Sequence, residues 1–114
     1  MATFVYLFRS SPATYQSMSP EEMQQAMSKW MNWRETLERS GHLKQRGHRL
    51  DTTGRVIRGR AKAVTDGPYV EVKDSIQGLI LVETENIDEA LELARGCPVL
   101  EADGTVEVRP VVAT

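Results

Sequence analysis

The chain has 114 residues, which suits a single domain, and we expect residues 1–114 to form it. A net charge of -2 and an ordinary composition give no indication of a nucleic-acid or membrane partner. A single cysteine, Cys97, excludes an internal disulfide and suits a reducing compartment. The N-terminal residues lack the basic region of a signal peptide, and no stretch approaches the ~20 apolar residues of a membrane span. We therefore expect a cytoplasmic location.

The first third of the chain predicts a strand, a loop and a long helix. Phe4 to Arg9 has apolar residues on both faces, so both faces should be covered. Ser10 to Met18 is expected to be a loop. Ser19 and Glu22 form a capping box that starts the helix, and Gly41 is a natural stop. We interpret the apolar stripe of this helix as core rather than as a cofactor site. Its members are Met23, Ala26, Met27, Trp30, Trp33 and Leu37.

The middle of the chain is basic. His42 to Leu50 predicts a second strand, and Val56 to Thr65 predicts a hairpin broken at Gly59. Half of the basic residues lie here, opposed only by Asp51, and they are Lys44, Arg46, Arg49, Arg55, Arg58, Arg60 and Lys62. We favour a solvated hairpin whose charges protect an edge strand, and the alternative is a site for a carboxylate or phosphate. Few aromatic residues interleave with these charges, so nucleic-acid binding is not expected.

A central stretch follows, from Thr65 to Glu83. It begins with a predicted tight turn, Asp66-Gly67-Pro68, in which Gly67 suits a backbone position closed to other residues. The side chain of Asp66 is expected to cap this turn. Pro68 fixes φ within the turn, Tyr69 begins a short extended piece, and Glu71 and Lys73 are expected to project just beyond the turn. The stretch ends in a strand, Ile76 to Glu83, with apolar residues on both faces.

The last third predicts a second helix and a final strand. Asn86 is placed to cap the helix, and Thr105 to Val111 reads as the strand. The order β-α-β-hairpin-β-α-β is a split βαβ pattern, which predicts an α+β, ferredoxin-like subunit with two helices on one face of an antiparallel sheet. The other face keeps apolar side chains. We therefore expect a homodimer in which two sheets pack face to face.

The block TDGPYVEVK resembles the TDGPF-x-E-x-K block that marks the DGPF-type branch of the YCII-related family, with Tyr69 in place of the phenylalanine. Further matching pieces are SPEEM at Ser19 to Met23, SGHL at Ser40 to Leu43 and VEVRP at Val106 to Pro110. The resemblance runs from Phe4 to Val112 and implies a ferredoxin-like subunit that pairs into a dimeric α+β barrel. Some relatives in this branch are encoded beside, or fused to, alternative sigma factors, which implies a regulatory role by analogy.

The resemblance also bears on catalysis. Type YCII sequences have a histidine in the first helix and an aspartate after the second, which are proposed as a catalytic pair. Matching SGHL places Trp30 at the histidine position, and matching the proline after the second helix places Cys97 at the aspartate position. An indole cannot accept a proton from a substrate, and a thiol replaces a carboxylate poorly. The proposed pair is therefore absent, and the chain is either inactive or uses other residues.

Other candidates for chemistry are few. His48 could act as a general base, although we favour a surface histidine. His42 and His48 share a face in an unbroken strand, but no carboxylate or thiol completes a site, so no metal is expected. Cys97 follows a helix C-terminus, where the dipole disfavours a thiolate nucleophile. The candidate pocket residues, with a structural ion pair as the alternative, are Arg109, Glu107, Glu83 and His48.

Two functional classes follow from these observations. The first is a binding or regulatory module for a small organic anion, anchored by Arg109 with help from the basic hairpin. The second is a metal-independent enzyme of lyase or oxygenase-like type, because dimeric α+β barrels host such chemistry. Fold alone does not decide between them. The missing catalytic pair favours the first class, and no cofactor is expected in either.

Overall fold

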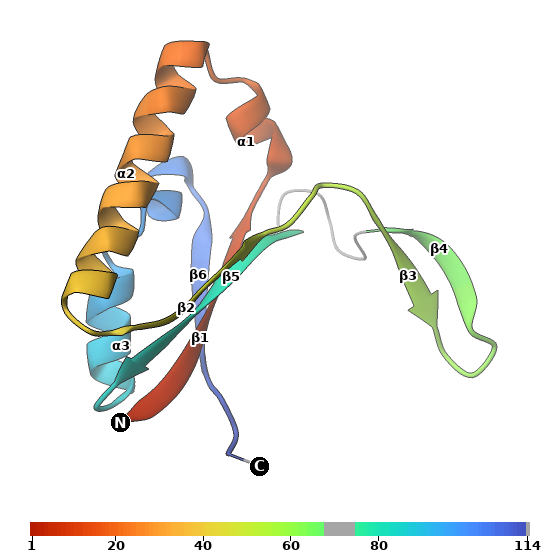
Figure 1. Cartoon of the computed structure of the whole chain (residues 1–114). Helices are drawn as coiled ribbons and strands as arrows, with labels where there is room; N and C mark the ends of the chain where they lie inside the picture. Colours follow the sequence, from red (N-terminus) through yellow and green to blue (C-terminus); the bar gives the residue numbers. More distant parts are fainter. Residues whose placement is uncertain (68–74, 114) are drawn as a thin grey trace.

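The computed structural model describes residues 1–67 and 75–113 of the chain. Its body is a four-stranded antiparallel sheet in the order β2-β5-β1-β6, covered on one face by helices (Figure 1). The strands are β1 (Ala2–Ser10), β2 (Leu43–Arg49), β5 (Ser75–Thr84) and β6 (Thr105–Pro110). Because β5 lies between β1 and β2 and runs antiparallel to both, the βαβ unit is split. The predicted ferredoxin-like α+β fold is confirmed.

The helices begin where the sequence places caps. Helix α2 (Pro20–Arg39) starts after Ser19, whose Oγ accepts a hydrogen bond from the Glu22 N–H at 3.1 Å. The Glu22 carboxylate accepts one in return from the Ser19 N–H at 3.0 Å, and this bond lowers the pKa of Glu22. Helix α3 (Ile87–Ala94) starts after Asn86, whose Oδ1 accepts from the Glu89 N–H at 2.9 Å. The predicted capping box and Asn86 cap are therefore confirmed.

Two short helical elements were not predicted. The segment expected to be a loop, Ser10 to Met18, contains helix α1 (Pro12–Gln16), so that expectation is wrong. Ser11 caps α1 by accepting a hydrogen bond from the Ala13 N–H at 3.3 Å. A 3-10 helix, η2 (Pro98–Ala102), links α3 to β6. Among the helices in the described parts of the chain, none has the length and apolar character needed to cross a membrane.

The core lies between the helices and the inner face of the sheet. Tyr6 at its centre is fully buried, stacks on Trp33 with ring centroids 6.0 Å apart, and donates a hydrogen bond to the Ala90 carbonyl. Burial raises the pKa of Tyr6. Only the C-terminal part of the α2 stripe is buried, at Trp33 and Leu37. The interpretation of the whole stripe as core is thus corrected, because Trp30 is only half-buried.

The opposite face of the sheet, called the outer face below, has no helix over it in the described structure (Figure 1). It presents apolar side chains that alternate with the buried ones along β1 and β5. They are Val5, Leu7, Leu79 and Leu81, each half-buried in the single chain. Strand alternation produces this second apolar surface.

Strands β3 (Gly54–Arg58) and β4 (Ala63–Gly67) form a separate hairpin, called the arm below. It projects away from the sheet on the side opposite the helices (Figure 1). The radius of gyration of 15.5 Å exceeds the roughly 13 Å of a compact chain of this length because the arm extends outward.

The first two residues of the predicted Asp66-Gly67-Pro68 turn lie in a strand, so the prediction of a turn there is wrong. Asp66 and Gly67 end strand β4 and pair with Arg55 and Gly54, and the φ of Gly67 is not positive. Their ladder with β3 accounts for the extended backbone. The other residues predicted to belong to this motif lie outside the described residues. They are Pro68, Tyr69, Glu71 and Lys73.

Candidate functional site

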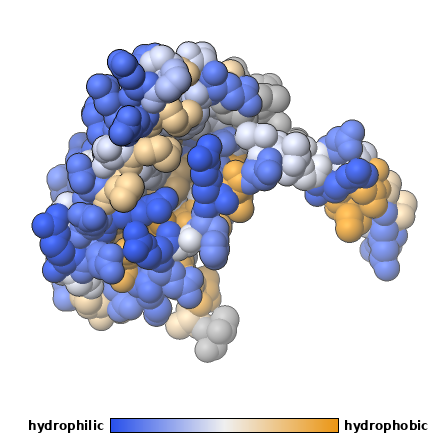
Figure 2. Space-filling model, turned by 45° about the horizontal axis from the view of Figure 1, so that its top comes forward, coloured by the Kyte–Doolittle hydropathy of each residue, from blue (hydrophilic) through white to orange (hydrophobic). Residues whose placement is uncertain are grey.

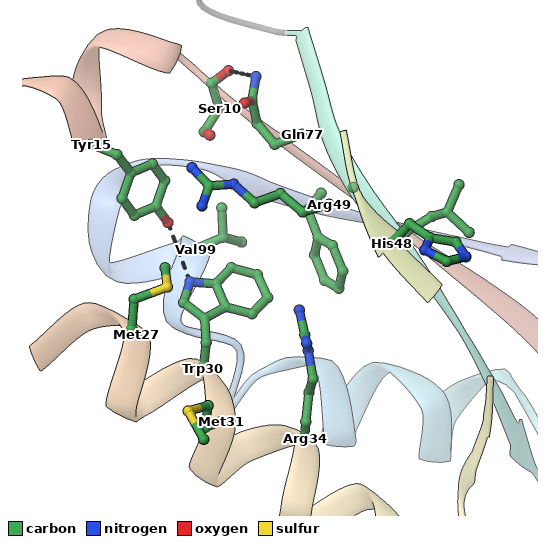
Figure 3. A pocket seen from close by; sticks show the side chains of 13 residues that line it. Ser10, Tyr15, Met27, Trp30, Met31, Arg34, His48, Arg49, Gln77 and Val99 are labelled. Carbon is green, nitrogen blue, oxygen red and sulfur yellow. Dashed lines mark hydrogen bonds between the residues drawn. The ribbon is translucent and has the colours of Figure 1, made fainter. Parts of the chain in front are cut away.

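A cavity of about 130 Å³ opens between α2 and the adjoining ends of β1, β2 and β5. We call it the α2 pocket. Figure 3 shows its side chains arriving from both helices α1 and α2 and from the sheet. The lining residues are Phe8, Ser10, Tyr15, Met27, Trp30, Met31, Arg34, His48, Arg49, Gln77, Gly78, Leu79 and Val99. The pocket therefore gathers residues from six elements that are distant in the sequence.

Aromatic rings form one wall of the α2 pocket. The rings of Phe8 and Trp30 meet edge to face, with centroids 5.0 Å apart. The Trp30 Nε1 donates a hydrogen bond to the Tyr15 Oη at 3.3 Å, which fixes the exposed edge of the indole (Figure 3). Met27 and Met31 lie on the same helix as Trp30. Flat, polarisable walls of this kind suit an apolar or aromatic ligand body.

Two arginines supply the charge of the α2 pocket. Arg34 lies one turn after Trp30 on α2, and Arg49 is the last residue of β2. In Figure 3 both side chains extend toward the space beside Trp30. Neither forms an ion pair with a carboxylate anywhere in the described parts of the chain, and no described lining residue is acidic. Arg34 is half-buried and Arg49 is exposed, and two cations with no acidic neighbour in the described lining make the site suited to an anion.

Two buried polar atoms in the described residues have no hydrogen-bond partner, and both belong to this pocket. They are the Nε of Arg34 and the Oγ of Ser10. Next to them, the Gln77 amide donates hydrogen bonds to the Ser10 carbonyl at 3.2 Å and to the Ser75 Oγ at 2.6 Å. Native proteins leave few buried polar atoms unpaired. The two unpaired atoms mark positions where a water or ligand would complete the site.

The pairing of β2 with β5 is irregular ahead of Arg49. Gly47 has φ +65°, and a Cβ on it would lie 1.7 Å from the carbonyl oxygen of Leu79 on β5. The pairing between β2 and β5 shifts twice, between Leu43 and Gln45 and between Gln45 and His48, after which His48 pairs with Leu79 and Arg49 with Gly78. Gly78 also allows close approach, since a Cβ there would lie 2.8 Å from the His48 carbonyl oxygen. The two shifts together leave Arg49 on the same face of the sheet as Leu43, which packs against the core on the helix side.

The two histidines have different neighbours, and the pairing of β2 is irregular between them. His48 is exposed, pairs with Leu79 of the outer face, and its ring points away from Trp30 (Figure 3). The Nδ1 of His42 lies 2.9 Å from the Glu83 carbonyl oxygen and 3.9 Å from a carboxylate oxygen of Glu89 on α3. The expectation of one unbroken strand face is therefore wrong. The described residues contain no group of three His, Cys, Asp or Glu side chains placed to hold a metal ion.

The other predicted pocket residues lie on the outer face. Arg9 Nε donates a hydrogen bond to Glu107 Oε1 at 3.2 Å, and Arg109 Nε lies 3.9 Å from Glu107 Oε2. Glu83 lies 3.7 Å from the Nζ of Lys44. Arg109, Glu107 and Glu83 are absent from the lining of the α2 pocket, which of the four predicted residues includes only His48. The role predicted for Arg109 in anion binding remains a prediction.

Sequence reasoning missed Arg34 and singled out Arg49 only as one member of the basic stretch. A signal for Arg34 was present. It follows Trp30 by four residues and precedes Leu37 by three, so it interrupts the apolar stripe of α2 with a charge. A charge within an apolar stripe is a signal worth testing for an anion site.

The two positions of the absent catalytic pair differ in their surroundings. Trp30 lines the α2 pocket, whereas Cys97 is buried in the core and is not part of the lining. Burial raises the pKa of the Cys97 thiol to about 12, against smaller lowering effects of the Val99 N–H and the Arg34 charge. Cys97 is therefore a protonated core residue, and burial rather than the helix dipole is the main cause.

Comparisons with known proteins agree with this fold. The model of the YCII-related domain family matches residues 2–114. An uncharacterised protein of Rhizobium meliloti (strain 1021) is 39% identical over 49 residues, a segment that spans 42% of this chain and 40% of that protein. A solved structure with the same fold is the 5-chloro-2-hydroxyhydroquinone dehydrochlorinase of Burkholderia phenoliruptrix AC1100, in complex with 2,5-dihydroxybenzoquinone. It has a TM-score of 0.54 and 14% identity, and the match covers 98% of this chain and 95% of that one. The chain belongs to the YCII-related domain family.

Proposed function

We propose that this protein binds a small organic anion of single-ring size in the α2 pocket. The observation that carries the proposal is the convergence of Arg34 and Arg49, without carboxylate partners in the described chain, on a cavity walled by aromatic rings. An arginine fork suits a carboxylate or an ionised enol, and the indole of Trp30 offers a flat surface to a ring. The unpaired Arg34 Nε supplies one donor for the anion.

The volume of the cavity supports the ring-sized ligand. An engineered apolar cavity of about 150 Å³ holds one benzene molecule. The α2 pocket, at about 130 Å³, is close to that size and is partly open to solvent. The dehydrochlorinase of like fold is described in complex with 2,5-dihydroxybenzoquinone, a planar compound with one ring. A single ring with one or two anionic groups is therefore the ligand class that we propose.

A metal-independent enzyme, such as a lyase, is the second candidate. The printed name of the structural relative, a dehydrochlorinase, favours it. The lining residues weigh against it, because the described ones include no carboxylate and the His48 ring points away from Trp30. A proton-transfer step needs an acid or base within hydrogen-bond reach of the ligand. We therefore place binding, with a regulatory role, ahead of catalysis.

We further propose that the protein is a cytoplasmic homodimer whose two sheets pack through their outer faces. The half-buried row of Val5, Leu7, Leu79 and Leu81 supports this arrangement, because a flat apolar sheet face is normally covered. The location rests on the single cysteine, Cys97, which is buried and unpaired.

A thermal-shift screen tests the proposed ligand class. The panel is benzoate, 2,5-dihydroxybenzoquinone, cyclohexanecarboxylate, acetate and inorganic phosphate. We expect the two planar compounds to raise the melting temperature most, since cyclohexanecarboxylate keeps the charge of benzoate but lacks its flat ring. Arg49→Gln should weaken binding by roughly 10- to 100-fold, as loss of a charged hydrogen bond does.

Arg109→Gln is the matched control, since it removes the same charge from the outer face. Equal weakening by both variants would show that general charge, rather than the α2 pocket, holds the anion. If Arg109→Gln alone abolishes the shift, the site lies on the outer face. A wild-type protein that responds to no member of the panel contradicts the proposal.

A further inference from the structure

The arm carries an apolar surface that nothing in the described chain covers. Ile57 on β3 and Val64 on β4 are direct cross-strand partners, and they are 68% and 56% exposed. Because paired residues of a hairpin share a face, the two side chains form one patch. Figure 2 shows hydrophobic side chains at the arm, apart from the rest of the molecule.

The arm also stands alone as a sheet. Strands β3 and β4 pair only with each other among the described strands. A two-stranded hairpin without cover is marginally stable in water, and three strands or a packed surface are normally needed. A surface packed against the arm would therefore both cover the apolar patch and stabilise the isolated hairpin.

The charge of the arm indicates what kind of surface it would pack on. Residues 54–67 contain four basic residues and one acidic residue, and the basic ones are Arg55, Arg58, Arg60 and Lys62. The whole chain has 14 basic and 16 acidic residues, so the residues outside the arm comprise 10 basic and 15 acidic ones. The arm is thus positive and the remainder negative. A second copy of the same chain offers the complementary charge.

The direction of the arm agrees with that partner. In Figure 1 the helices lie on one side of the sheet, and the arm projects beyond the other side, where the outer face lies. A second chain packed on the outer face would lie beside the arm. We infer that the arm clasps the partner subunit of the dimer, with Ile57 and Val64 packed on the partner and the arm's basic residues facing its acidic body. This inference rests on the proposed dimer but not on the proposed ligand.

Cross-linking between subunits tests the inference. A benzoylphenylalanine replaces Ile57, and unlabelled protein is mixed with protein labelled with ¹⁵N before irradiation. Mass spectrometry then distinguishes links between chains from links within a chain. We expect mixed light–heavy products from position 57, and few from the same probe at Gln24, an exposed residue of α2 on the helix side of the molecule.

Sedimentation equilibrium gives an independent measurement. Ile57→Asp should raise the dimer dissociation constant at least about tenfold, because each arm loses apolar contact and gains the wrong charge. Gln24→Asp, which adds the same charge elsewhere, should leave it unchanged. A dimeric protein that gives only links within one chain from position 57 overturns the clasp and leaves the dimer standing. A monomer at micromolar concentration overturns both, while the ligand screen remains a separate test of the α2 pocket.

Discussion

Replacing Gly47 with alanine should damage both the stability and the site of this protein. Gly47 combines φ +65° with a position where an added Cβ would lie 1.7 Å from Leu79 O and 2.7 Å from Leu79 C. The left-handed conformation alone costs a non-glycine residue about 1–2 kcal/mol. The backbone contact cannot be relieved by a side-chain rotation, so β2 must move away from β5. Losing two or three ladder hydrogen bonds at about 1 kcal/mol each brings the total to roughly 3–5 kcal/mol.

Gly41 provides a matched control for this substitution. It has φ +81°, but a Cβ there would meet nothing within 4 Å. Gly41→Ala should therefore cost only the conformational term of about 1–2 kcal/mol. Urea unfolding followed by circular dichroism gives both free energies. Equal losses for the two variants would refute the reasoning, since they would show that β2 does not approach β5 this closely at Gly47.

Two further predictions concern the core. Trp33→Ala should cost about 3–5 kcal/mol in free energy of unfolding, and Trp30→Ala clearly less, because Trp33 is buried and Trp30 is half-exposed in the α2 pocket. Urea melts in which Trp30→Ala is the more damaging would contradict this order. Stability should fall as the pH rises from about 9 to 12, because the unfolded chain releases the Cys97 proton from pH 9.0 while the folded chain holds it to about 12. Tyr6, with its raised pKa, adds to this trend. Cys97→Ala should flatten the pH profile of the melting temperature, and an unchanged profile would contradict a buried, protonated thiol.

Much of the fold could be predicted because its signals are local. Ser19 and Glu22, and Asn86 and Glu89, are short-range pairs, and each makes the backbone contacts that its spacing indicates. The two-sided apolar strands could also be recognised from alternation alone. The error at Asp66 and Gly67 has a physical cause as well. A glycine before a proline favours a turn, but pairing with Arg55 and Gly54 keeps these residues extended.

The candidate site could not be predicted because it depends on contacts across the sequence. Arg34 and Arg49 converge because the pairing of β2 with β5, whose register shifts twice before Arg49, brings distant segments of the sequence together. Nothing in the local spacing of the basic stretch distinguishes Arg49 from its neighbours. Alternation in an unbroken strand also put His42 and His48 on one face, whereas the pairing of β2 is irregular between them. The one local feature of the sequence that pointed to the pocket was Arg34, a charged residue within the apolar stripe of α2.

The most direct test of the account is the NMR signal of the arginine Nε–H groups during titration with benzoate. Arg34→Gln and Arg49→Gln assign the two pocket resonances, and Arg109→Gln assigns an outer-face reference. The Arg34 Nε is buried without a partner, so an anion in the α2 pocket should shift its resonance strongly, with a smaller shift for Arg49. The Arg109 signal should stay in place. Shifts confined to Arg109, or the absence of any shift at millimolar benzoate, would contradict an anion site in the α2 pocket.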